Sequence, residues 1–133
     1  MRKYQLASGK VLEFNLAGVE QALSVYRAVL HECKGAGLDI TVLPEETIAD
    51  VIIKNKEAVL NIMSSEAVMD AVVECCGKVL YDKQHFSIGL FNDEKAREDL
   101  LPVIAIVGME TIRPFFPALR SFLDAIQSLF LKQ

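Results

Sequence analysis

The chain has 133 residues, of which 52% are hydrophobic, and it contains no tryptophan. Its net charge of −4 argues against a nucleic-acid-binding protein, because phosphate contacts need a basic surface. The longest apolar stretch, Pro102 to Met109, is much shorter than the ~20 residues that cross a bilayer, so we expect no membrane partner. We expect one domain spanning residues 1–133, a length that supports a hydrophobic core.

The cysteine content predicts a reducing compartment. Cys33, Cys75 and Cys76 are odd in number and two are adjacent, which is not the pattern of a disulfide framework. The N-terminus leads into alternating residues and lacks the apolar segment of a secretion signal. We therefore expect a cytoplasmic protein.

Residues 1–16 are predicted to form a β-hairpin. Apolar residues alternate with polar ones on both sides of Ala7-Ser8-Gly9-Lys10, where Gly9 suits a tight turn. A lone hairpin is marginally stable in water, so its apolar face must pack on the rest of the chain. Residues 17–133 are predicted to be helical, and the whole is expected to be a mainly α protein: a compact bundle of about four to five helices with a short N-terminal hairpin.

Helical spacing of apolar residues defines the elements that follow. One helix runs from Val19 to Cys33 and ends at Gly35-Ala36-Gly37, and Leu38 to Leu43 is a linker or a brief strand. Pro44 suits the start of a second helix whose stripe runs from Ile48 to Met63. Ser64 or Ser65 is expected to cap a third helix, which carries Val68 to Leu80.

A loop is predicted from Tyr81 to Gly89, followed by a fourth helix from about Asp93. Either Asn92 or Asp93 is expected to accept a hydrogen bond from the first helical turn. Pro102 lies inside the apolar pattern, so we expect the helix to kink or end there.

A final helix is predicted after Arg113-Pro114, and its apolar face is wide. Because a small domain seldom buries all of its terminal helix, we interpret this face as core or as an interface with a partner. The C-terminal helix and the hairpin are the candidate contact surfaces, and the candidate partner-binding residues are Phe115, Phe116, Leu119, Phe122, Leu123, Ile126 and Phe130. Together with the hairpin edges, this face predicts a homo-oligomer.

Few residues favour catalysis, and the sequence predicts neither an enzyme nor a cofactor or metal site. Cys75 and Cys76 fall late in a predicted helix, where the dipole opposes a thiolate, and we expect one thiol in the core and one at its rim. A Cys–His pair with His85 remains an alternative if the fold brings them together. The acidic cluster of Asp93, Glu94, Glu98 and Asp99 is expected to stabilise the helix start and stay solvated, with binding of a cation or a basic partner as the alternative.

The order of three motifs resembles the tail assembly chaperones of long-tailed phages and prophages of Gram-positive hosts. The first is the hairpin Tyr4 to Phe14, with Ser8-Gly9-Lys10 at its turn. The second is the end of the first helix, Val29 to Asp39. The third is Leu90-Phe-Asn-Asp-Glu-Lys-Ala-Arg-Glu-Asp99 followed by Arg113-Pro-Phe-Phe116. Leu100 and Leu101 depart from the pattern, because relatives tend to carry aromatic residues there, and Pro102 interrupts a helix that relatives often keep.

The resemblance implies a non-enzymatic protein of the host cytoplasm that is absent from the finished virion. It implies that the protein binds the tape measure protein and keeps it soluble. It also implies that the protein then helps tail tube subunits to polymerise around the tape measure protein. In this family a programmed ribosomal frameshift often yields a longer second product, which carries an extra C-terminal domain. Phe130-Leu131-Lys132 permits the slippery codons of such a frameshift.

Two alternatives are open. A structural virion protein, such as a tail completion or connector subunit, would share an apolar oligomerising surface. A small thiol enzyme would use Cys75 or Cys76 with His85.

Overall fold

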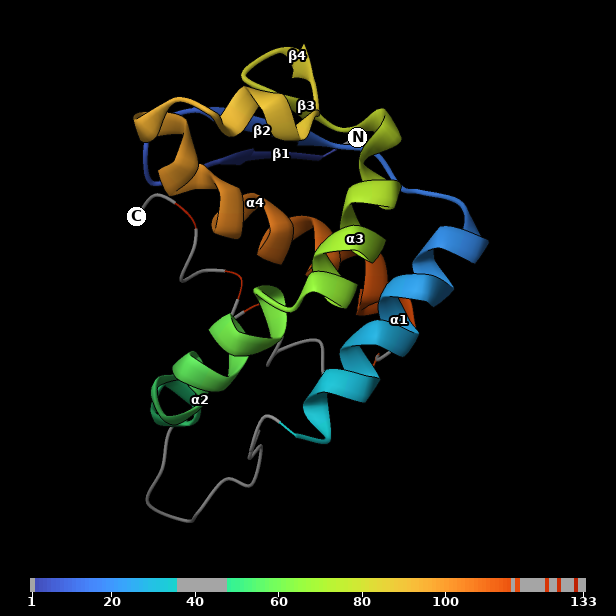
Figure 1. Ribbon diagram of the computed structural model, residues 1–133. Coiled ribbons are helices and arrows are strands. Elements are labelled where there is room, and N and C mark those ends of the chain that lie inside the picture. Colours follow the sequence, from blue (N-terminus) through green and yellow to red (C-terminus); the bar gives the residue numbers. More distant parts are fainter. Residues whose placement is uncertain are drawn as a thin grey trace.

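The computed structural model describes residues 2–35 and 48–115, with Pro117, Asp124, Gln127 and Leu131; of residues 48, 49 and 51–54 it describes the backbone alone. The protein is mainly helical with a short N-terminal hairpin, as predicted (Figure 1). Two of the predicted segments, the linker or strand at Leu38–Leu43 and the helix start at Pro44, lie outside the described residues. So does most of the predicted final helix.

The predicted N-terminal hairpin is confirmed. β1 (Arg2–Gln5) pairs antiparallel with β2 (Val11–Phe14), with Tyr4 opposite Leu12. Gly9 in the turn has a φ of +94°, a conformation that strains residues with a side chain. Leu12 and Phe14 are buried on one face, which is the alternation that the sequence predicts.

A second hairpin extends this sheet, so the predicted loop at Tyr81–Gly89 is wrong. β3 (Leu80–Tyr81) pairs with β2, and β4 (Gln84–His85) pairs with β3, giving the order β1-β2-β3-β4. Asp82 and Lys83 form the turn with φ of 51° and 66°. Strands of two residues are too short to show alternation, which is why the pattern did not reveal them.

Three helices, α1 to α3, pack on the side of the core away from the hairpins. α1 (Val19–Cys33) and α2 (Ile48–Met63) agree with the predicted stripes. Ser65 caps α3 (Glu66–Glu74) by accepting a hydrogen bond from the Val68 N–H, which confirms one of the two predicted caps. The chain then tightens into a 3₁₀ helix, η1 (Cys75–Lys78).

The fourth helix, α4 (Glu94–Ile112), is the centre of the molecule. It follows the 3₁₀ helix η2 (Ile88–Phe91), and a further 3₁₀ turn, η3 (Arg113–Phe115), continues from its end. Pro102 does not end it, contrary to one of the two predicted outcomes. Every residue from Val103 to Ile112 is buried, and this burial outweighs the ~3 kcal/mol that an interior proline costs.

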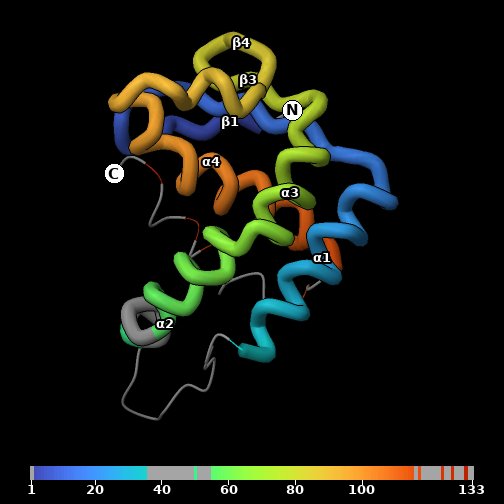
Figure 2. The backbone as a smooth tube through the Cα atoms, in the orientation of Figure 1, coloured from blue at the N-terminus to red at the C-terminus, as the bar shows by residue number. Residues whose placement is uncertain are grey.

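The elements form layers around α4. The two hairpins lie together on one side of it, and α1, α2 and α3 lie toward the other (Figure 2). Gly108 of α4 faces α3: a Cβ at this position would lie 3.4 Å from a methyl group of Val72. Within the described ranges, no helix combines the length and the apolarity that a membrane span requires.

Candidate functional site

Phe115 is the one predicted partner-binding residue that the structure describes. It is half-buried, packs against the core and lies 5.2 Å from the Tyr26 ring, centroid to centroid. Phe115 therefore serves the core at least in part. The other six predicted residues lie outside the described part of the chain: Phe116, Leu119, Phe122, Leu123, Ile126 and Phe130.

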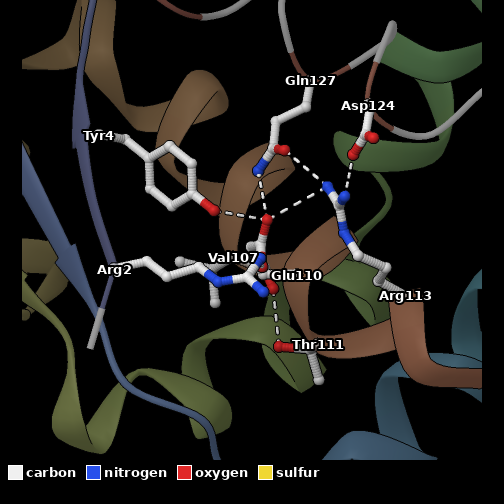
Figure 3. A network of polar contacts seen from close by, with 8 residues as sticks. All are labelled: Arg2, Tyr4, Val107, Glu110, Thr111, Arg113, Asp124 and Gln127. Atoms are coloured by element: carbon white, nitrogen blue, oxygen red, sulfur yellow. Dashed lines mark hydrogen bonds and ion pairs between the residues drawn. The ribbon is translucent and has the colours of Figure 1, made fainter. Parts of the chain in front are cut away.

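A buried carboxylate near the end of α4 organises the most extensive polar cluster. Glu110 is 5% exposed, and Figure 3 shows donors approaching it from several directions. Its Oε1 accepts from the Tyr4 hydroxyl at 2.5 Å and from Gln127 at 3.0 Å, and it lies 3.2 Å from the Arg113 guanidinium. Its Oε2 accepts from Arg2 at 2.7 Å. A charge this buried is tolerable because it is surrounded by donors.

We call these residues and one further acid the Glu110 cluster: Arg2, Tyr4, Glu110, Arg113, Asp124 and Gln127. Arg113 donates to Gln127 at 2.7 Å and pairs with Asp124. The cluster thus joins β1, the end of α4 and two residues near the C-terminus. Burial and donation to Glu110 raise the pKa of Tyr4, which keeps its hydroxyl protonated and donating.

A second buried carboxylate lies at the start of α4. Asp99 is 3% exposed, and its Oδ2 accepts from the Ser8 hydroxyl at 2.7 Å and the Tyr81 hydroxyl at 2.5 Å. The prediction that this acidic cluster stays solvated is therefore wrong for Asp99. Burial, together with the bond to Asp99, raises the pKa of Tyr81.

A polar cleft of about 460 Å³ opens beside Asp99, between the hairpin turns and the first turns of α4. Lys10 and Asp82 form an ion pair of 3.0 Å at its wall. Asp93 occupies the predicted N-cap position of α4, but its side chain makes no capping hydrogen bond, so that expectation is wrong. The cleft is lined by charges of both signs, with acids in excess.

The spacing of the two carboxylates explains how the hairpin is held. Asp99 and Glu110 are eleven residues apart, close to three helical turns, so they share one face of α4 about 16 Å apart. Their partners in the hairpin lie at two different levels, Tyr4 within β1 and Ser8 in the turn that follows it. The helix therefore binds both ends of the first hairpin.

The cysteines and histidines offer no activated thiol. Cys75 and Cys76 are 1% and 2% exposed, so the expectation of one thiol at the rim is wrong. Burial raises the pKa of Cys75 to about 11 and that of Cys76 to about 12, the opposite of what a nucleophilic thiol needs. Cys76 donates to the Val72 carbonyl, while His85 is exposed on β4.

Sequence reasoning missed the role of Glu110. It lies between Met109 and Thr111 in an otherwise apolar run, and a lone acid in such a run is a sign of a buried, paired charge. The eleven-residue interval back to Asp99 was a second available signal. Within the described ranges, no three acids, histidines or cysteines are placed to hold a metal ion.

The arrangement is suited to holding segments together. Both carboxylates accept from side chains of the sheet, and Glu110 also accepts from near the C-terminus. Comparisons of the chain with models of protein families, with curated proteins and with solved structures gave no match.

Proposed function

We propose that this protein is a non-enzymatic tail assembly chaperone of a long-tailed phage or prophage. In this proposal it binds the tape measure protein, keeps it soluble in the host cytoplasm and promotes polymerisation of the tail tube protein around it. A frameshifted longer product would make the contact with the tube, and the chain would be absent from the mature virion.

One observation supports the proposal most directly: residues from separate motifs of the resemblance meet in space. Ser8, in the turn of the first motif, donates to Asp99, the last residue of the long third motif. Within that third motif, Arg97 donates to the carbonyl of Phe91, which is itself buried. Residues that depend on one another in this way are expected to recur together in a family.

The second half of the third motif joins the same framework. Arg113 contacts Glu110, which in turn accepts from Tyr4 in the first motif. The resemblance therefore involves residues that contact one another across the fold, and chance matches scattered along a chain would not be expected to do so.

The test is co-expression with the product of the gene immediately downstream, followed by affinity pull-down. We expect that product to be very long, rich in coiled coil, and soluble only with this chain. If it stays insoluble or does not bind, the proposal is wrong. Finding this polypeptide in purified particles would instead favour the structural virion protein.

A matched pair of variants tests the predicted client surface. Phe122→Gln with Phe130→Gln alters two predicted contact residues, and we expect the client to become insoluble. Val19→Gln alters an apolar residue of α1 that is 66% exposed and lies outside both candidate contact surfaces, and we expect no effect. Circular dichroism establishes that both variants fold. Equal client solubility with both would contradict the C-terminal contact surface.

A further inference from the structure

Two helices of this protein present outer faces with opposite charge. On α3, Glu66, Asp70 and Glu74 are exposed and lie four residues apart, so they form one acidic row. Among the residues that the structure describes, none of these three carboxylates has an ion-pair partner.

Helix stability explains only the first member of the acidic row, because Glu66 lies in the first turn of α3, where the helix dipole favours an acid. Like charges four residues apart repel, which disfavours the helix at Asp70 and Glu74. Glu74 is also the last residue of α3, where the negative end of the dipole disfavours an acid. Asp70 and Glu74 therefore have a small cost for α3 itself, and an external cation would offset that cost.

The acidic row borders an open groove of about 540 Å³. Its apolar wall consists of Met69 and Val73 of α3 and Ile88 of η2, the last of which is 48% exposed. A surface with an apolar wall beside an acidic row fits the face of a helix that carries exposed apolar and basic residues.

α1 of the same chain has such a face. Arg27 and His31 are exposed along its last two turns, opposite its buried residues, and Lys34 follows directly at the C-cap; the same face carries Leu30. Leu30 is 39% exposed, and these four side chains border one shallow hollow on the surface. Within the described ranges, none of the three basic residues forms an ion pair.

We propose that the groove on α3 of one copy receives the outer face of α1 of a second copy. Arg27 and Lys34 would lie against the acidic row, and Leu30 would pack against the apolar wall. α1 and α3 lie side by side within one molecule (Figure 1), and the residues of the two outer faces are exposed to solvent. Because two different surfaces meet, the contact need not stop at a dimer.

The contact depends largely on exposed charges, so it is expected to be weak and sensitive to salt. We would measure sedimentation velocity of the full chain at concentrations up to about 0.5 mM, where weak contacts of this kind are populated. Association is expected at about 0.05 M salt and should fall steeply by about 0.5 M, where charges are screened over a few ångströms.

Charge reversal identifies the faces. Asp70→Lys and Arg27→Glu should each weaken association about tenfold, since each replaces an attraction with a repulsion. Glu57→Lys and Lys56→Glu make the same changes of net charge on the exposed surface of α2 and should have little effect. Combining D70K with R27E in one chain should restore association to within about threefold of the original, because the reversed faces again attract.

Three results would overturn the inference. The first is a chain that stays monomeric at low salt and the highest concentration. The second is an equal loss of association in D70K and its control E57K, because the loss would then come from the change of net charge and not from the α3 surface. The third is a double reversal that fails to restore association. The test needs no client protein, so its outcome is independent of the proposed function.

Discussion

Replacing Glu110 with Gln should destabilise the fold by about 2–3 kcal/mol, although the side chain keeps its size. Oε1 of Glu110 accepts hydrogen bonds from Tyr4 and Gln127 and pairs with Arg113. In the variant, the side-chain carbonyl oxygen of the new Gln can occupy the Oε1 position. Each bond would then lose its charge assistance, about 1 kcal/mol apiece. Part of this loss is offset because the neutral Gln side chain avoids the desolvation cost of a buried carboxylate. Arg113 also keeps Asp124 as a partner.

The contribution of each partner should follow its burial. Tyr4→Phe removes one bond to a charged acceptor and should cost about 1.5 kcal/mol. Arg2→Ala should cost less than about 1 kcal/mol, because the Arg2 side chain is 61% exposed and its ion pair is screened by water. The double variant Y4F/E110Q should cost less than the sum of the two single changes, because Y4F removes the bond that E110Q weakens.

Urea unfolding followed by circular dichroism at neutral pH measures these differences. With a slope of about 1.5 kcal/mol per molar urea, E110Q should lower the midpoint by about 1.3–2 M. Arg2→Ala is the matched control, since it removes the partner of the same carboxylate whose side chain is exposed to solvent. If E110Q shifted the midpoint no more than R2A does, the charge of Glu110 would not be what holds the cluster together.

Three further results are expected. The raised pKa values of Cys75 and Cys76 give a stability that is complete below about pH 9 and is lost as pH rises through about 11 for Cys75 and about 12 for Cys76. The free energy of unfolding from urea titrations should fall by up to about 1.4 kcal/mol per pH unit for each thiol, and Cys→Ala variants should flatten this slope. Ser65→Ala should cost about 1 kcal/mol in urea unfolding because it removes a cap, whereas Asp93→Ala should cost less, and equal losses would contradict the capping geometry. Asp99→Asn should lower stability by about 1–2 kcal/mol, since two hydrogen bonds lose their charged acceptor; an unchanged thermal midpoint would contradict this.

Elements with a strong local pattern were predictable from the sequence. The first hairpin alternates over four residues on each side of Gly9, and α1 and α3 repeat apolar residues at helical spacing. β3 and β4 were not predictable, because two residues per strand give no period and Asp82-Lys83 is not a typical turn sequence. α4 continues past Pro102 because tertiary burial outweighs local propensity, which a local pattern does not report.

The polar clusters were harder to predict than the helices. Asp99 lies among charged residues and looks solvated in sequence, yet it is buried because Ser8 and Tyr81 arrive from segments far along the chain. Glu110 depends on Arg2 and Tyr4 in the same way, more than a hundred residues away. Partners at such separations leave no local signal, and the signals within the sequence were the isolation of Glu110 in an apolar run and its eleven-residue interval from Asp99.

The positions of Asp99 and Glu110 also determine how the function is best tested. A two-stranded hairpin needs support, and α4 supplies it by binding Ser8 near one end and Tyr4 near the other. The motif residues Ser8, Asp99 and Arg113 are therefore part of the framework, and their loss would destabilise the hairpin. A chaperone defect in such variants would not separate folding from client binding. Substitutions at exposed residues that lie outside both clusters, compared at equal stability, separate client binding from the integrity of the fold.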